Sequence, residues 1–230
     1  MADITLGAFF EYGSGSYDTY NSYANLSDVH ADGDVDFVGG GILTRFDFGK
    51  SEKGTTYVEA AARFGRSTNE YASNDFTIPV RFNMRSNYFG VNFGLGHVFN
   101  ITDTVSMDLY AKYIWTHQSG EEVRVTDNEL VRFEDVDSHR IRAGLKVSIK
   151  ASDYISPYFG AAYEYEADAR AHATLYVTPL NVPGLKGSTG IAEAGITVST
   201  GTAANIDIGV QGHVGKRKGV SGNVNLKFEF

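Results

Sequence analysis

The last eleven residues of the chain, VSGNVNLKFEF from Val220 to Phe230, alternate strictly between two kinds of side chain. One set is apolar or small and consists of Val220, Gly222, Val224, Leu226, Phe228 and Phe230. The residues between them are polar or charged. Because successive side chains of a β-strand point to opposite faces, this pattern predicts a strand with one apolar and one polar face. Such a strand leaves a sticky edge in a soluble protein, but it can close the ring of a transmembrane β-barrel.

The same alternation recurs along the whole chain and predicts an all-β protein. Ten segments show it: residues 4–12, 38–48, 57–64, 88–99, 105–115, 140–149, 155–166, 192–198, 206–214 and 220–230. Short turns rich in Gly, Asp, Asn and Ser alternate with long polar connections. The long ones are residues 14–34, 70–86, 118–135 and 171–188. We therefore predict an antiparallel up-and-down β-barrel of about ten strands, with both chain ends on the side of the short turns.

Composition narrows the class of protein. The 230 residues contain no cysteine, so neither disulfides nor thiolate metal sites are available. The formal net charge of −8 argues against a nucleic-acid partner. No apolar run is long enough for a membrane-spanning helix, but a barrel hides its apolar residues in alternate positions. Residues 1–3 do not form a signal peptide, so we expect an outer-membrane form of the protein to begin differently.

Alternation alone does not say which face of the barrel is apolar. A soluble barrel has its apolar side chains inside, and a membrane barrel has them outside. Two features favour lipid contact on the outside. Aromatic residues such as Tyr12, Trp115 and Phe228 stand near strand ends on the apolar face, as they do at membrane interfaces. The polar face also mixes charges of both signs with many glycines and tyrosines, which suits a crowded lumen.

Several stretches resemble the translocator β-domain of bacterial autotransporters. They include GAFFEYG at residues 7–13, LYAKYIWT at 109–116, DSHRIR at 137–142, YFGAAYEYE at 158–166, LKGSTG at 185–190 and the C-terminal Phe. The resemblance covers residues 1–230 as a single domain. It implies a type V secretion pore in the outer membrane of a Gram-negative bacterium. It also implies twelve strands after a pore helix, so we expect that helix and the first two strands to be missing from this chain.

The resemblance further implies three kinds of partner. They are a passenger polypeptide in the same chain, outer-membrane lipid and lipopolysaccharide, and the barrel-assembly machinery. The family's C-terminal assembly signal is matched by Asn223, Phe228 and Phe230, although Asn225 stands where glycine is usual. A final strand with a lipid-facing side explains the same residues without any such signal.

Charged residues on the polar face are the main candidates for function. We predict that they line a pore in which neighbouring strands pair opposite charges. The candidates are Glu59, Arg63, Asp108, Lys112, Arg140, Arg142, Lys146, Glu164, Glu166 and Glu193. Pairs that only stiffen the wall remain an equal alternative.

Catalysis is not expected. Glu164 and Glu166 are paired carboxylates, but no activated serine or metal-ligand spacing accompanies them. The six histidines are scattered, and the glycines at 39–41 lack the lysine and helix of a phosphate loop. We expect no cofactor and no metal.

Two further possibilities remain open from the sequence. The run Lys216-Arg217-Lys218 lies at the tip of the last outer hairpin, on the same side of the barrel as the long connections. There it could contact lipopolysaccharide phosphates or be merely solvated. The chain itself could be a truncated or engineered pore, or a soluble barrel that binds a ligand within an apolar interior.

Overall fold

The computed structural model is an all-β protein. It describes residues 3–21, 29–75, 79–125, 130–169, 172–175, 178–180, 184–201 and 204–228. A large sheet of ten strands has the order β1-β2-β3-β4-β5-β8-β9-β12-β13-β14. These strands are β1 (Asp3–Asn21), β2 (Val29–Ser51), β3 (Gly54–Ser73), β4 (Val80–Asn100), β5 (Val105–Gln118), β8 (Val136–Ile149), β9 (Ile155–Glu166), β12 (Gly187–Ser199), β13 (Ala204–Gly215) and β14 (Gly219–Phe228).

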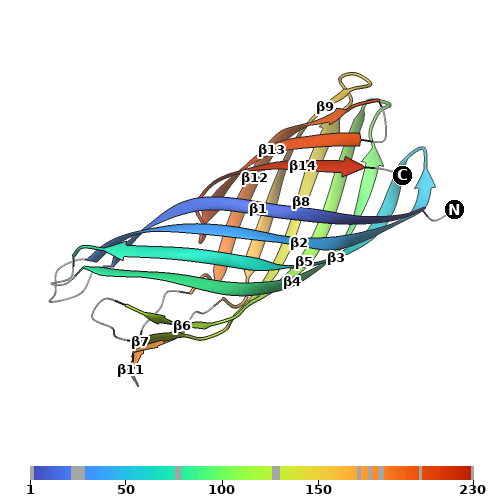
Figure 1. Cartoon of the computed structure of the whole chain (residues 1–230). Helices are drawn as coiled ribbons and strands as arrows, with labels where there is room; N and C mark the ends of the chain where they lie inside the picture. Colours follow the sequence, from blue (N-terminus) through green and yellow to red (C-terminus); the bar gives the residue numbers. More distant parts are fainter. Residues whose placement is uncertain are drawn as a thin grey trace.

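All ten predicted strands are present, and each pairs antiparallel with its neighbours in the sheet. The up-and-down order brings the N- and C-terminal ends to the same end of the sheet (Figure 1). The Gly49 turn, where φ is +64°, lies at that end too, since β1 and β2 pair from Asp3 opposite Asp47. The predicted class is therefore confirmed.

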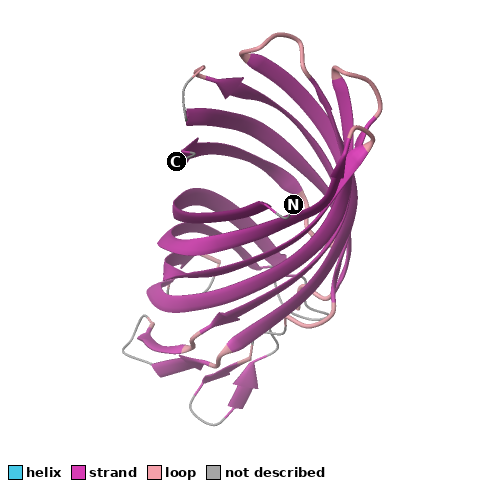
Figure 2. Ribbon diagram, turned by 90° about the vertical axis from the view of Figure 1, so that its right-hand side faces the viewer, coloured by secondary structure: helices cyan, strands magenta, loops and turns pink. Residues whose placement is uncertain are grey.

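The sheet curls into an incomplete ring, as Figure 2 shows along the axis of the curl. Within the described residues, no backbone pairing joins β1 to β14. Both strands therefore have one edge of backbone amide and carbonyl groups without a strand partner in this part of the chain. In lipid such edges are costly, because no water is present to hydrogen-bond them.

The apolar face of the curled sheet is the convex one. Phe10, Phe93 and Leu95 expose 76, 58 and 61% of their surface, whereas Tyr57 and Glu164 on the concave face expose 2 and 1%. A soluble barrel with an apolar interior would show the reverse, so this alternative is wrong. We call the exposed apolar band of the convex face the apolar belt.

Tyrosines fill the concave face by lying across glycines of the next strand. Tyr57 reaches over Gly96 to the carboxylate of Asp108, with hydroxyl to oxygen distances of 3.0 and 3.1 Å. Tyr88 crosses Gly65 and Gly39 and donates to Glu11 at 2.7 Å. In each case a ring from one strand reaches a carboxylate two or three strands away. Such bridges need a neighbour without a side chain, and they fix the local curvature.

The first four strands extend well beyond the apolar belt. They contain 19, 23, 20 and 21 residues, whereas a tilted strand needs about 9–11 to cross a bilayer. We call their protruding parts, residues 13–21, 29–37, 66–73 and 80–87, the tall wall. The expectation of long loops at 14–34 and 70–86 is therefore largely wrong, because backbone pairing continues beyond the belt, where the convex face has become polar.

The tip of the tall wall is tied by a polar contact. The backbone amide and ring nitrogen of His30 lie 2.6 and 3.0 Å from the same carboxylate oxygen of Asp75. These hydrogen bonds hold the pKa of Asp75 below its ordinary value, and the bond from the backbone amide has the larger effect.

A second, smaller sheet lies beside the tall wall (Figure 1). It has the order β11-β10-β7-β6 and consists of β6 (Glu121–Arg124), β7 (Leu130–Phe133), β10 (Ala173–Leu175) and β11 (Thr178–Leu180). Residues 118–135 and 171–188, expected to be loops, therefore contain strands. Alternation over three or four residues is too short to be recognised in the sequence.

The small sheet packs on the inner face of the tall wall. Val123 and Val131 are buried there against Phe82 and Met84 of β4. The ring of Phe82 lies 5.6 Å from that of Phe133 and stacks at 4.9 Å on that of Tyr71. This apolar cluster forms a separate core above the belt.

The tyrosine bridges can be tested with one substitution at two glycines. An added Cβ at Gly96 would lie 2.6 Å from the Tyr57 ring, whereas at Gly212 it would meet nothing within 4 Å. Gly96→Ala must displace a buried, hydrogen-bonded ring, so we expect it to lower the free energy of unfolding by about 1–3 kcal/mol. Gly212→Ala should change it by less than about 0.5 kcal/mol. Urea unfolding in detergent micelles measures both, and equal effects would contradict this role of Tyr57.

Candidate functional site

The concave face gathers the charged residues of the large sheet. All ten candidates from the sequence lie on it: Glu59 and Arg63 on β3, Asp108 and Lys112 on β5, Arg140, Arg142 and Lys146 on β8, Glu164 and Glu166 on β9, and Glu193 on β12. Asp108 stands opposite Lys146, as expected for a pairing of opposite charges, whereas Lys112 stands opposite Arg142, a residue of like charge. Arg142 and Arg140 in turn face Glu164 and Glu166.

Glu164 is the centre of the strongest charge cluster. Its carboxylate is 1% exposed and accepts hydrogen bonds from Arg142, at 2.9 Å from Nε and 2.7 Å from Nη2. Its other oxygen is held by Arg217. Two guanidinium groups on one buried carboxylate satisfy its charge from both sides.

Arg217 makes a contact that neither expectation for the run at 216–218 included. This residue lies in the β13–β14 turn but directs its guanidinium group toward Glu164 on the concave face. Arg217 thus has a partner within the chain, and contact of the run with lipopolysaccharide phosphates stays a prediction. The sequence hid this because Glu164 and Arg217 are 53 residues apart.

Further ion pairs extend the cluster along the concave face. Glu166 accepts from Ser138 Oγ at 2.6 Å and from the amide of His139 at 2.8 Å, with Arg140 Nε at 3.8 Å. Arg63 approaches Glu11 at 3.4 Å. The contacts of Glu166 join the neighbouring strands β8 and β9, and the pair of Arg63 with Glu11 spans from β3 to β1 across β2, so they brace the curl of the sheet.

The remaining candidates occupy the half nearer the chain ends. Lys112 pairs with Glu59 across β4 at 2.6 Å, rather than with a residue on an adjacent strand. Glu193 accepts from Gln211 at 3.1 Å, and Lys146 lies 4.8 Å from the centre of the Tyr158 ring. A wall whose charges pair internally stays wet without binding any one ligand tightly.

Sequence reasoning missed several residues of this face. Glu11, Tyr57, Tyr88, Tyr158 and Asp207 all take part in its hydrogen bonds. The sequence signal for these tyrosine bridges was a tyrosine on the polar face of one strand and glycines on the polar face of the neighbouring strand. Recognising it requires the register between strands, which the sequence does not state.

The convex face carries the expected aromatic side chains. At the edge of the apolar belt away from the chain ends, polar groups lie beside these rings. The indole Nε1 of Trp115 donates to Asp137 at 3.0 Å, and the hydroxyl of Tyr113 lies 2.7 Å from His139 Nδ1. Tyr163 contacts Ser188 Oγ at 2.7 Å. Aromatic rings with one polar contact are typical of membrane interfaces.

The proposed assembly signal is only partly described. Asn223 lies on the concave side of β14 and donates to Asp207 at 3.3 Å. Phe228 ends β14, but its side chain, like the whole of Phe230, lies outside the described residues. The usual glycine position is taken by Asn225, which also donates to Asp207 at 3.3 Å.

Among the described residues, no group of three or more His, Cys, Asp or Glu side chains is arranged to hold a metal ion. In the same residues, no helix is long and apolar enough to cross a membrane.

Comparison with known families decides the assignment. The model of the autotransporter beta-domain family matches residues 2–213. The chain belongs to the autotransporter β-domain family. Members lie in the outer membrane of Gram-negative bacteria as translocator barrels for passenger export, and this autotransporter β-domain is one of them. A search of curated proteins finds no match.

Solved structures share the fold at low sequence identity. The transport unit of AIDA-I from Escherichia coli is 16% identical, with a TM-score of 0.67 over 100% of this chain and 76% of its own. The translocator domain of NalP from Neisseria meningitidis is 13% identical, with a TM-score of 0.61, 98% of this chain and 82% of its own covered. The β-domain of Bordetella BrkA is 15% identical, with a TM-score of 0.63, and the match covers 100% of this chain and 92% of the BrkA chain.

The Glu164 cluster predicts a large difference between two carboxylates. Glu164→Gln leaves Arg142 and Arg217 close together with no anion between them, so we expect a loss of about 2–4 kcal/mol in the free energy of unfolding. The control is Asp153→Asn, which removes the exposed ion pair with Lys150 and should leave stability unchanged. Urea unfolding in detergent measures both, and an unchanged stability of Glu164→Gln would refute the buried cluster.

Proposed function

We propose that the concave face of this β-domain lines the route by which the passenger crosses the outer membrane. The supporting observation is the separation of the two faces: exposed apolar side chains on the convex side and internally paired charges on the concave side. The candidates from Glu59 to Glu193 would keep an extended passenger segment hydrated while it passes. Their charges already have partners, so the segment would meet no strong single binding site.

This proposal assigns the domain a physical role in transport and no chemical step. Glu164 and Glu166, the paired carboxylates, are engaged by arginines and by donors from Ser138 and His139. A general acid or base must be able to reach a substrate proton. Carboxylates held in this way stabilise the concave wall and are poorly placed to transfer a proton to or from a substrate.

We further propose that strands from outside residues 1–230 complete the ring between β1 and β14. The sheet is open there in the described residues, and the aligned part of AIDA-I is 76% of that chain. Two added strands would pair both open edges and give the family pattern of twelve. A preceding segment in the pore would fit the same arrangement.

For the partners, we propose that the barrel-assembly machinery recognises the final strand, where Asn223 has the expected polar side chain. Lipid would contact the apolar belt. Lipopolysaccharide would surround the part of the convex face in the outer leaflet.

Single cysteines test the lumen directly, because the chain has none of its own. Glu193→Cys places a thiol on the concave face, and Ile208→Cys places one on the apolar belt, where Ile208 is 51% exposed. In cells, a water-soluble maleimide should label position 193 only, and a passenger halted during export should block that labelling.

The same pair of variants tests closure of the ring. A lipid-soluble maleimide should label position 208 and spare position 193 if the gap between β1 and β14 is filled. Labelling of 193 by the lipid-soluble reagent would refute closure. Labelling of 193 that a halted passenger does not change would refute the proposed route.

A further inference from the structure

Two arginines of the concave face converge on a single hydroxyl group. Arg63 of β3 extends across Gly90 of β4, where an added Cβ would lie 3.1 Å from Arg63 Nε, and its Nη2 donates to Thr116 Oγ1 at 3.3 Å. Arg140 of β8 donates from its own Nη2 to the same oxygen at 3.4 Å. Since β3 and β8 lie on either side of β5 in the sheet, the two guanidinium groups approach Thr116 from opposite directions.

The carboxylates nearest to these arginines make their shorter hydrogen bonds with other groups. Glu11 lies 3.4 Å from Arg63 Nη1, and its other oxygen accepts a bond of 2.7 Å from a tyrosine hydroxyl. Glu166 lies 3.8 Å from Arg140 Nε and accepts bonds of 2.6 and 2.8 Å from a serine hydroxyl and a backbone amide of β8. Neither carboxylate therefore lies between the two guanidinium groups.

Arg140 is incompletely hydrogen-bonded although it is largely buried. Its side chain is 17% exposed, and its Nε atom is buried without a hydrogen-bond partner. Within the part of the chain that the structure describes, it is the one charged side chain with such an atom. A buried donor without an acceptor costs free energy, and the cost is larger when the donor is charged. An acceptor brought to this arginine would remove that cost.

The neighbouring cluster shows which group fits between two arginines. The carboxylate of Glu164 lies between Arg142 and Arg217, and each of its oxygens is bonded to one guanidinium group. The pair of Arg63 and Arg140 has an uncharged hydroxyl in the corresponding place. The ion pairs of this part of the face also join four arginines to only three glutamates: Arg63, Arg140, Arg142 and Arg217 with Glu11, Glu164 and Glu166. One positive charge is therefore left in excess.

We propose that Arg63 and Arg140 form a binding site for one carboxylate group, with the hydroxyl of Thr116 as a third donor. The planar guanidinium fork matches the two oxygens of a carboxylate. The Thr116 oxygen accepts from both arginines, so its own proton is free to be donated to the ligand. The carboxylate comes either from an acidic side chain of a polypeptide in the lumen or from a small carboxylate in solution. The first source rests on the proposed transport route, and the second does not.

The expected binding is weak, which is compatible with passage of a polypeptide. The side chain of Arg63 is 32% exposed, so water competes with the ligand for it. We expect a dissociation constant on the order of 1 mM for a single carboxylate. Such a site would orient an acidic residue of a passing segment and release it again.

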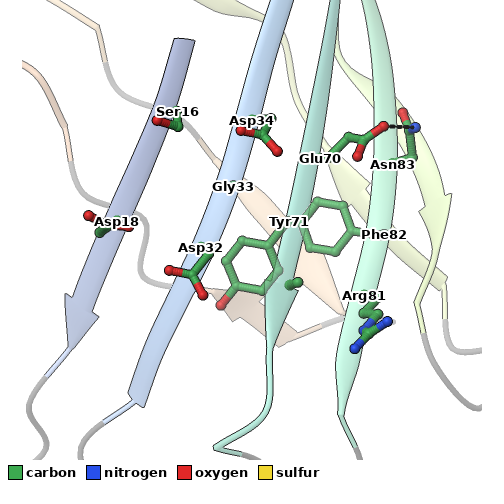
Figure 3. Close-up of a pocket in the computed structure, with 11 residues that line it drawn as sticks. Ser16, Asp18, Asp32, Gly33, Asp34, Glu70, Tyr71, Arg81, Phe82 and Asn83 are labelled. Carbon is green, nitrogen blue, oxygen red and sulfur yellow. Dashed lines mark hydrogen bonds between the residues drawn. The ribbon is translucent and has the colours of Figure 1, made fainter.

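The groove on the tall wall has the opposite charge and does not compete for anions. Figure 3 shows that the side chains along it are mostly acidic and that Arg81 is the one cationic residue among them. The acidic residues are Asp18, Asp32, Asp34 and Glu70. Their negative potential repels a carboxylate. Anion binding measured on the whole protein is therefore not expected to arise at this groove.

Thermal unfolding tests the site, because a ligand that binds only the folded state raises the midpoint temperature. The β-domain is extracted from the outer membrane in mild detergent, and heat-dependent gel mobility follows its unfolding. We expect about 10 mM sodium acetate to raise the midpoint by about 3 °C relative to sodium chloride of equal ionic strength. Arg63→Gln and Arg140→Gln should each abolish this shift. The matched control is Arg66→Gln, an exposed arginine on the same strand, which should keep it.

A carboxylate built into the site gives a second test that does not depend on the arginine variants being folded. Thr116→Glu places an anion between the two guanidinium groups, so it should raise the midpoint without acetate and abolish the response to acetate. Thr116→Gln has the same length without the charge and should not raise the midpoint. The proposal is refuted if acetate does not shift the unchanged protein, if both arginine variants keep the shift, or if Thr116→Glu still responds to acetate.

Two peptides with blocked ends distinguish the sources of the carboxylate. One carries a single central glutamate, and the other has glutamine in its place. A larger shift from the glutamate peptide than from equal acetate assigns the site to a polypeptide in the lumen, whereas a shift from acetate alone assigns it to small carboxylates. Equal shifts from the two peptides would contradict recognition of a carboxylate. Binding of acetate does not depend on the maleimide labelling at positions 193 and 208, so this proposal and the transport route fail separately.

Discussion

Backbone hydrogen bonding within lipid governs this structure. Amide and carbonyl groups that enter the hydrocarbon region must find partners inside the protein, because water is absent there. The chain meets this demand by pairing ten strands side by side through the membrane-crossing region. Once the strands are paired, the two faces of the sheet separate, and the alternation of side chains decides which face lipid can touch. The open edges of β1 and β14 are the places where the demand is unmet within the described residues.

On the concave face, charged side chains of a curled sheet must be stabilised by partners within the protein. Tyrosines cross glycines to reach carboxylates on strands further along, as Tyr57 does to Asp108 over Gly96. Arginines do the same over longer distances, and Arg217 reaches back from a turn to the buried Glu164. The outcome is a polar surface that is already satisfied. Such a surface suits passage of a polypeptide better than selective binding.

The sequence predicted the parts of the fold that depend on period-two alternation. Strands such as 105–115 and 206–214 were recognisable because a side chain every second residue was apolar. The tall wall was missed because the apolar side chains of the convex face give way to polar ones beyond the belt, although backbone pairing continues to Asn21 and Val29. The small sheet was missed because its strands have only three or four residues.

The candidate site also has a part that the sequence predicted and a part that it did not. The charged residues of β5, β8 and β9 were found because their spacing places them on one face, and adjacent strands could be paired by order alone. The partner of Lys112 is Glu59, two strands away, and that of Glu164 includes Arg217 from a turn. Contacts of this kind depend on curvature and on the direction of long side chains, which become visible only in three dimensions.

The central claim is that the apolar convex face meets lipid, and the single tryptophan tests it without any substitution. Trp115 lies on that face at the edge of the belt, with its ring 5.9 Å from that of Phe89 and its Nε1 bonded to Asp137. The measurement is the fluorescence of the protein in vesicles of brominated lipid, compared with quenching by acrylamide in the aqueous phase. The structure predicts strong quenching by lipids brominated close to the headgroup and weak quenching by acrylamide. Strong acrylamide quenching with no effect of brominated lipid would place Trp115 in water and contradict the assignment of the two faces.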